Sequence, residues 1–129
     1  MFDTVLVAGL GLMGGSMAKT IKARTLSRVL GWNRTRATAE QALADGSIDA
    51  IATDALFREV DLVIIGLYPQ ATVDWLLENM PKMKKGCVIV DMVGVKQFMV
   101  DHLEQAALDA GVHYVGGHPM AGREFSGLD

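Results

Sequence analysis

Short apolar runs alternate with longer segments of helical spacing along the whole chain. The strongest runs are TVLVA, LVIIGL and CVIVD, which are typical of strands buried on both faces of a parallel sheet. Pro69, two residues after the second of them, predicts a helix start, because proline suits a first helical turn. The pattern predicts strands at 4–8, 28–32, 50–53, 62–67, 87–91 and 112–115, and helices at 13–24, 35–44, 69–80 and 96–110. Strands that alternate with helices from end to end predict an α/β fold with a doubly wound parallel sheet.

The composition excludes several functional classes. At 129 residues, 50% of them hydrophobic, the chain fits one domain with no internal boundary. Its 12 Lys and Arg against 15 Asp and Glu give a net charge of −3, which leaves no basic surplus for nucleic acid. One cysteine excludes a disulfide framework and a multi-cysteine metal site, and no apolar run reaches the ~20 residues of a membrane span. We therefore expect a soluble, cytoplasmic protein that binds neither nucleic acid nor a membrane and holds no metal.

A glycine-rich turn follows the first predicted strand. The stretch GLGLMG matches G-x-G-x-x-G between a strand and a helix, which is the setting of a dinucleotide-binding turn. Gly9 permits the tight turn, Gly11 lets a pyrophosphate approach the backbone, and Gly14 lets the helix pack closely. The amides of Leu12 and Met13 then lie at the helix N-terminus, where free N–H groups and the helix dipole favour an anion. We therefore expect a Rossmann dinucleotide-binding fold; the alternative is a purely structural glycine turn.

The residues after the second predicted strand bear on the choice between NAD and NADP. NAD-binding proteins usually carry Asp or Glu here, which accepts a hydrogen bond from the ribose 2′-hydroxyl. This chain has Asn33, followed by Arg34, Thr35 and Arg36. No carboxylate is present to repel a 2′-phosphate, and two guanidinium groups are placed to pair with one. We expect these four residues to bind the cofactor with a preference for NADP over NAD; the alternative is that both arginines only begin a solvated helix.

Three more segments follow strands that end at the same predicted edge. Leu67 and Tyr68 end one strand and are expected to line the cofactor groove. DMVGVK (91–96) and GGHPMAGREFSG (116–127) also leave strands at their carboxyl ends, where open α/β sheets bind ligands. His118 stands between a glycine pair and a proline, so we expect it on a loop as a positioned acid–base.

The motifs GLGLMGGSMA, D-x-x-G-V-K and GGHPMAGRE-x-SG together resemble the prephenate/arogenate dehydrogenase family over essentially the whole chain. The resemblance implies NAD(P)-dependent oxidative decarboxylation of prephenate to 4-hydroxyphenylpyruvate, or of arogenate to tyrosine, in tyrosine biosynthesis. It implies that His118 is catalytic and binds the ring 4-hydroxyl of the substrate. The substrate-binding residues that it implies are Gly94, Lys96, Glu124 and Ser126. Many family members carry a serine where this chain has Gly94, so one hydrogen-bonding partner of the histidine is missing here.

The same resemblance implies a chemistry and a domain arrangement. Hydride leaves the ring carbon that bears the hydroxyl for the nicotinamide, while neutral His118 accepts or polarises the hydroxyl proton. Loss of the ring carboxylate as CO2 then aromatises the ring. Family members carry a further helical domain that completes the substrate pocket and forms the homodimer. We expect this domain to be absent from residues 1–129, which would then bind cofactor without turnover.

Two other functions are compatible with parts of the sequence. GLGLMGGSMAK and WNRT also resemble the N-terminal motifs of NADPH-dependent β-hydroxyacid dehydrogenases. That family would show a D-x-S/T segment and a G-x-x-G-A-x-x-G substrate loop, whereas this chain has HPMAG. A non-catalytic NAD(P)-sensing domain would need only the cofactor cleft, and the histidine loop argues against it.

Overall fold

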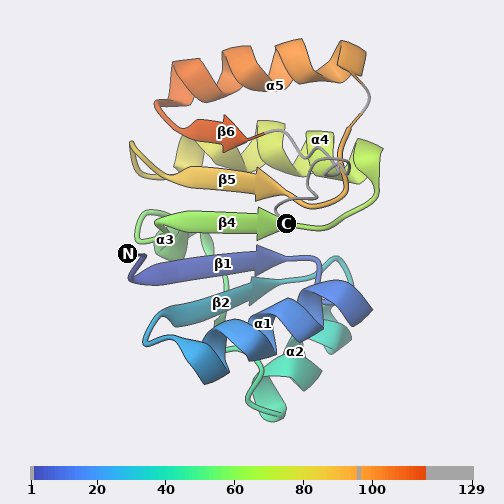
Figure 1. Cartoon of the computed structure of the whole chain (residues 1–129), viewed down its shortest axis with the longest axis vertical. Helices are drawn as coiled ribbons and strands as arrows, with labels where there is room; N and C mark the ends of the chain where they lie inside the picture. Colours follow the sequence, from blue (N-terminus) through green and yellow to red (C-terminus); the bar gives the residue numbers. More distant parts are fainter. Residues whose placement is uncertain (1, 96, 116–129) are drawn as a thin grey trace.

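The computed structural model of the chain describes residues 2–95 and 97–115. Within these residues, six parallel strands form one sheet in the order β3-β2-β1-β4-β5-β6 (Figure 1). The strands are β1 (Thr4–Ala8), β2 (Arg28–Trp32), β3 (Ala50–Ile51), β4 (Leu62–Ile65), β5 (Val88–Asp91) and β6 (His113–Val115). The helices are α1 (Leu12–Arg24), α2 (Arg36–Ala44), α3 (Asp54–Phe57), α4 (Pro69–Asn79) and α5 (Gln97–Ala110), with a 3-10 turn η1 (Met80–Lys82) after α4.

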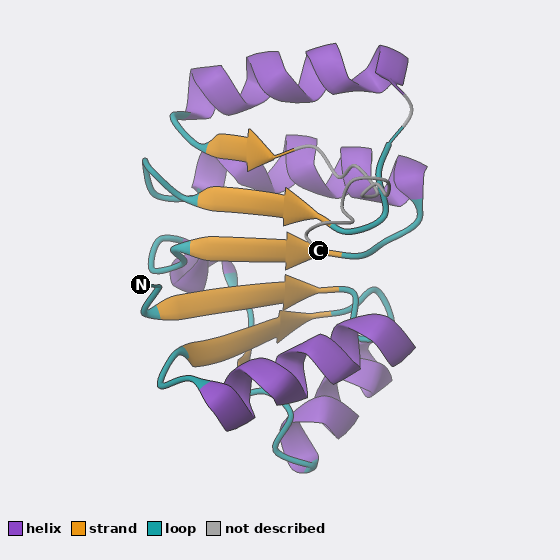
Figure 2. Cartoon of the chain, in the orientation of Figure 1, coloured by secondary structure: helices purple, strands orange, loops and turns teal. Residues whose placement is uncertain are grey.

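Helices cover both faces of the sheet (Figure 2). Successive side chains of β1 point to opposite faces, and all five of its residues are buried. Val5 and Val7 pack with α1 and α2 in one apolar core. Leu6 and Ala8 belong to a second core, which includes residues of α3, α4 and α5. A strand buried on both sides explains the unbroken apolar run that predicted it.

The central strand β1 lies between β2 and β4. The chain leaves β1 toward β2 and β3 and then crosses back to β4, so the direction of winding reverses between β1 and β4. β1, β2, β4, β5 and β6 point the same way in Figure 1, which places the loops after β1, β2, β4 and β5 at one edge. Ligands of open α/β sheets bind in the crevice at this edge, at the point of reversal.

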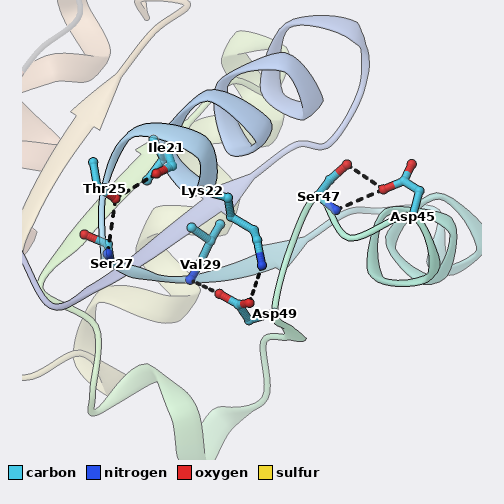
Figure 3. A network of polar contacts seen from close by, with 8 residues as sticks. All are labelled: Ile21, Lys22, Thr25, Ser27, Val29, Asp45, Ser47 and Asp49. Atoms are coloured by element: carbon cyan, nitrogen blue, oxygen red, sulfur yellow. Dashed lines mark hydrogen bonds and ion pairs between the residues drawn. The ribbon is translucent and has the colours of Figure 1, made fainter.

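Carboxylates hold the opposite edge of the sheet together. Asp49 accepts hydrogen bonds from Nζ of Lys22 in α1 at 2.5 Å and from the amide of Val29 in β2 at 2.8 Å (Figure 3). Asp45 likewise accepts from the amide and hydroxyl of Ser47 in the loop after α2. These contacts fix the loops between α2 and β3.

The predicted doubly wound parallel sheet is confirmed, with corrections at the ends of several elements. β1 and β2 have the predicted bounds. β4 ends at Ile65 rather than 67, because Gly66 makes the last ladder bond, to the Ala8 carbonyl at 2.9 Å, before the chain turns away. β5 begins at Val88 rather than 87, because the amide of Cys87 closes a turn on the Lys84 carbonyl at 3.2 Å.

The third strand and the helix after it differ most from the prediction. β3 spans only Ala50–Ile51 instead of 50–53, and it pairs with β2 alone at the edge of the sheet. The short helix α3 (Asp54–Phe57) was not predicted. Four residues make about one helical turn, which is too short for a helical repeat to show in the sequence.

Candidate functional site

The glycine turn between β1 and α1 has the close backbone contacts that its glycines predict. Gly9 has φ +96°, and a Cβ there would lie 2.9 Å from the carbonyl oxygen of Gly66. A Cβ on Gly14 would lie 1.6 Å from the carbonyl oxygen of Gly9, so α1 can begin this close to the turn only without a side chain. A Cβ on Gly11 would meet no protein atom within 4 Å. The turn is thus tightly packed on the protein side and open where a phosphate would approach.

Helix α1 presents its N-terminus to this open side. Gly11 is the N-cap, and Leu12 and Met13 open the first turn, so their amides have no acceptor within the helix. The first turn contains no acidic residue. The side chain of Met13 is exposed beside it. Unpaired amides at the positive end of the helix dipole make this turn suited to an anion.

Asn33 joins the loop after β2 to the glycine turn. Its Oδ1 accepts a hydrogen bond from the amide of Leu10 at 2.7 Å, and its Nδ2 donates to the carbonyl of Thr35 at 3.1 Å. The residue that stands where NAD-binding proteins usually carry an acid therefore holds the turn in place. The sequence did not predict this second role, because it depends on the register between β1 and β2.

A groove of about 480 Å³ lies between the loops that follow β2 and β4. Trp32 at the end of β2 and Arg34 in the loop after it line one side, and Leu67 and Tyr68 in the loop after β4 line the other. The groove begins at the carboxyl ends of β2 and β4, the two neighbours of β1, and continues along α4. The structure thus brings the predicted residues Arg34, Leu67 and Tyr68 around one space. Tyr68 is 85% exposed, so its ring is available to a ligand.

Helix α4 supplies a wall of this groove that the sequence analysis missed. Gln70, Asp74 and Glu78 recur every four residues and line the groove together with Trp75. Nε2 of Gln70 donates to Oδ1 of Asp74 at 2.9 Å. Trp75 is buried and packs against Trp32, with ring centroids 5.8 Å apart. The i, i+4 spacing was the available signal, since it places three polar side chains on one helix face.

Thr35 and Arg36 begin α2 and do not line this groove. Thr35 is the N-cap without a side-chain capping bond. Nε of Arg36 pairs with Oε2 of Glu40 at 3.3 Å, and both side chains are well exposed. Exposed ion pairs of this kind contribute little to stability, so the guanidinium of Arg36 can readily exchange Glu40 for another partner.

Gly94 lies in the loop that follows β5. It has φ +85°, a conformation in which a serine would be strained. The amides of Val93 and Gly94 donate to Oδ1 of Asp91 at 2.9 and 3.0 Å, and the hydroxyl of Tyr114 donates to Oδ2 at 3.2 Å. The glycine that replaces the family's serine therefore suits the backbone of this loop.

A comparison with protein families identifies the family of this chain. The family model described as prephenate dehydrogenase, nucleotide-binding domain, matches residues 17–129. The chain belongs to this family. The match begins inside α1, after the glycine turn, so the turn is an observation independent of the family match.

Individual relatives agree with this assignment of a nucleotide-binding domain. The prephenate dehydrogenase of Bacillus subtilis is 37% identical over 132 residues, which cover 99% of this chain and 35% of that protein. The prephenate dehydrogenase of Lactococcus lactis is 29% identical over 96% of this chain and 36% of its own length. This nucleotide-binding domain thus spans about a third of the length of these relatives.

Solved structures show the same fold. The prephenate dehydrogenase of Aquifex aeolicus, in complex with hydroxyphenyl propionate and NAD+, superposes with a TM-score of 0.79 at 25% identity, over 95% of this chain and 43% of that one. The arogenate dehydrogenase of Synechocystis superposes with a TM-score of 0.72 at 22% identity, over 80% of this chain and 37% of that one. The second likeness concerns the fold alone.

Four predicted substrate-side residues lie outside the described residues. They are Lys96, His118, Glu124 and Ser126. Of the predicted site, the structure therefore shows the cofactor side and Gly94. The roles of Lys96, His118, Glu124 and Ser126 stay predictions.

Within residues 2–95 and 97–115, no three His, Cys, Asp or Glu side chains gather closely enough to hold a metal ion. No helix in this part of the chain is long and apolar enough to cross a membrane. Cys87 is fully buried, and burial raises the pKa of its thiol to about 12, so the thiol stays protonated at neutral pH.

Proposed function

We propose that this nucleotide-binding domain serves a dehydrogenase that uses a nicotinamide cofactor to decarboxylate prephenate or arogenate oxidatively. The observation that carries the proposal is the family match to residues 17–129. The open glycine turn and the groove beside it support the cofactor part of the proposal independently, since both lie at the carboxyl edge where the sheet reverses its winding.

We propose further that NADP is preferred over NAD. Asn33 carries no charge and uses its Oδ1 on the Leu10 amide, so nothing at this position repels a 2′-phosphate. Arg34 lines the groove, and Arg36 is held only by an exposed pair with Glu40. Charge-assisted hydrogen bonds contribute roughly 1.5–3 kcal/mol each, so one of them supports a preference of about tenfold.

The residues of the chain divide between cofactor and substrate in this proposal. The amides of Leu12 and Met13 would hold the pyrophosphate, and Leu67 and Tyr68 would line the cofactor groove. The nicotinamide, when bound, would accept hydride from the ring carbon that bears the substrate hydroxyl. His118 would accept or polarise the proton of that hydroxyl, which is the part of general acid–base catalysis assigned to this chain.

Replacement of His118 tests the proposed chemistry. In the full-length protein, His118→Asn should lower kcat with prephenate or arogenate by about 10²–10⁴-fold, the usual contribution of general acid–base catalysis. The Kd of NADP+ should stay within about twofold, because the histidine acts on the substrate. Steady-state absorbance of the reduced cofactor measures the first quantity and calorimetry the second.

His113→Asn is the matched control, since His113 is exposed on β6 only a few residues earlier. It should leave both quantities unchanged. A His118→Asn variant that keeps most of its kcat would show that the proton is handled elsewhere. A parent protein that turns over neither substrate would overturn the proposed reaction.

A further inference from the structure

The carboxylate of Asp91 is buried at the carboxyl end of β5, with 1% of the residue exposed. Both of its oxygens accept hydrogen bonds. Oδ1 accepts from the amides of Val93 and Gly94 at 2.9 and 3.0 Å, and Oδ2 accepts from the hydroxyl of Tyr114 in β6 at 3.2 Å. A buried carboxylate is costly unless donors surround it, so these three donors are held where they are.

The hydroxyl of Tyr114 is a lasting donor in this arrangement. Burial raises the pKa of Tyr114, and the negative charge of Asp91 raises it further. The phenol therefore stays protonated at neutral pH. Tyr114 thus ties the end of β5 to β6, next to the backbone pairing of these two strands.

The hydrogen bonds to Asp91 give the loop of residues 92–95 one shape. They fold Val93 and Gly94 back over the end of β5, where Gly94 takes φ +85°. The amide of Met92 donates to the carbonyl of Ile65 at 2.9 Å, and its side chain lies so close to Gly66 that a Cβ there would be 3.0 Å from it. The loop is therefore fixed against the connection after β4 as well.

The position of this loop in the sheet indicates which part of a cofactor it faces. In a dinucleotide-binding sheet the pyrophosphate lies at the glycine turn after β1, and the adenosine ribose lies beside the residues after β2. The loops after β4 and β5 lie on the other side of β1. The nicotinamide half is therefore left to this side, at the loop that Asp91 folds.

We propose that Asp91 and Tyr114 are a positioning pair that holds residues 92–95 in the shape that the nicotinamide half of the cofactor requires. This inference rests on the proposed cofactor binding. We assign neither Asp91 nor Tyr114 a contact with the reacting atoms, because the pair acts through the backbone of residues 92–95.

The test compares two ligands on the chain by calorimetry: NADP+, and adenosine 2′,5′-bisphosphate, which lacks the nicotinamide half. Asp91→Ala should weaken the binding of NADP+ by about tenfold, because the loop of residues 92–95 must then be ordered during binding. The affinity for the bisphosphate should change less than about twofold. Asp91→Asn should restore NADP+ binding to within about threefold, since its carbonyl accepts both amides and its NH2 group donates to the tyrosine oxygen.

Asp61→Ala is the matched control. Asp61 also accepts from two backbone amides, those of Asp3 and Thr4 at 2.9 Å each, and it also has one side-chain donor, Lys84, but it lies at the opposite edge of the sheet. This variant should lower the thermal midpoint without changing either affinity. If Asp91→Ala fails to fold, Tyr114→Phe takes its place as the test variant. It should weaken the binding of NADP+ by about threefold and leave the binding of the bisphosphate unchanged.

The outcomes separate this inference from the proposed function. A parent chain that binds neither ligand overturns both. A parent chain that binds both ligands, with variants that weaken both equally or neither, overturns only the positioning role of Asp91 and Tyr114.

Discussion

Asn33 holds two loops through one amide group, and we propose that the same group sets the choice of cofactor. Its carbonyl oxygen fixes the Leu10 amide in the glycine turn, while its NH2 group fixes the loop that carries Arg34 by donating to Thr35. A carboxylate could make the first contact and could not make the second, because it has no hydrogen to donate. The neutral amide therefore holds both loops and places no negative charge at this position.

Asn33→Asp should reverse the cofactor preference. The new carboxylate would repel the 2′-phosphate of NADP and accept from the 2′-hydroxyl of NAD, so we expect Kd for NADP+ to rise by about tenfold or more and Kd for NAD+ to stay equal or fall. Titration of both cofactors on the same sample gives an internal control. A variant that loses both affinities equally would assign Asn33 a structural role alone.

At this scale, the sequence predicted which residue types the site needs and missed what their side chains contact. The glycines were predictable, because each is demanded by the local path of the backbone at Gly9 and Gly14. The contacts of Asn33 with Leu10 and of Tyr114 with Asp91 cross between strands far apart in the chain. They depend on strand register and on neighbour order, which a motif does not contain.

Elements were predicted best where burial is most complete. β1 is buried over its whole length and β2 at its three central residues, so the ends of both strands coincide with the apolar pattern. β3 and α3 are two and four residues long, respectively, and offer no repeat from which a period could be read. Doubly wound order followed from the alternation of elements, and the reversal at β1 and β4 follows from that order.

Asp61, directly before β4, forms an ion pair with Lys84 that makes the stability of the fold depend on pH. The hydrogen bond from Lys84, with those from the amides of Thr4 and Asp3, holds the pKa of Asp61 below its usual value, and partial burial opposes them. A carboxyl whose pKa is lower in the folded state than in the unfolded one stabilises the fold fully above its unfolded pKa, about 4. This contribution is lost as the pH falls through the lower, folded-state pKa.

Asp61→Asn should therefore lower the thermal midpoint by ~2–5 °C at neutral pH and by less in acid. Thermal melts near pH 7 and pH 3 measure both values. Asp101→Asn, which removes one exposed charge from α5, is the matched control and should shift neither midpoint appreciably. An equal loss at both pH values would show that the charge of Asp61 does not contribute.

At the scale of the whole molecule, the two edges of the sheet differ, and the carboxyl edge carries the candidate site. The amino edge is held by carboxylates such as Asp49 and Asp61. The carboxyl edge gathers the glycine turn, the groove and the loop after β5, and here the exposed side chains of Met13, Tyr68 and Val93 remain uncovered. Membership in the prephenate dehydrogenase nucleotide-binding domain family indicates a nucleotide as the ligand class of this edge, and the neutral Asn33 is the basis of the proposed preference for NADP.

The most direct test of this account is a calorimetric titration of the chain with NADP+ and with NAD+ under the same conditions. We expect NADP+ and NAD+ to bind at one site, with NADP+ bound more tightly by about tenfold or more. Gly14→Ala should abolish binding of both, since a Cβ there would lie 1.6 Å from the Gly9 carbonyl oxygen and would displace α1 from the turn. Equal affinities, or tighter binding of NAD+, would contradict the cofactor preference, and binding of neither would contradict the assignment of the carboxyl edge as a dinucleotide site.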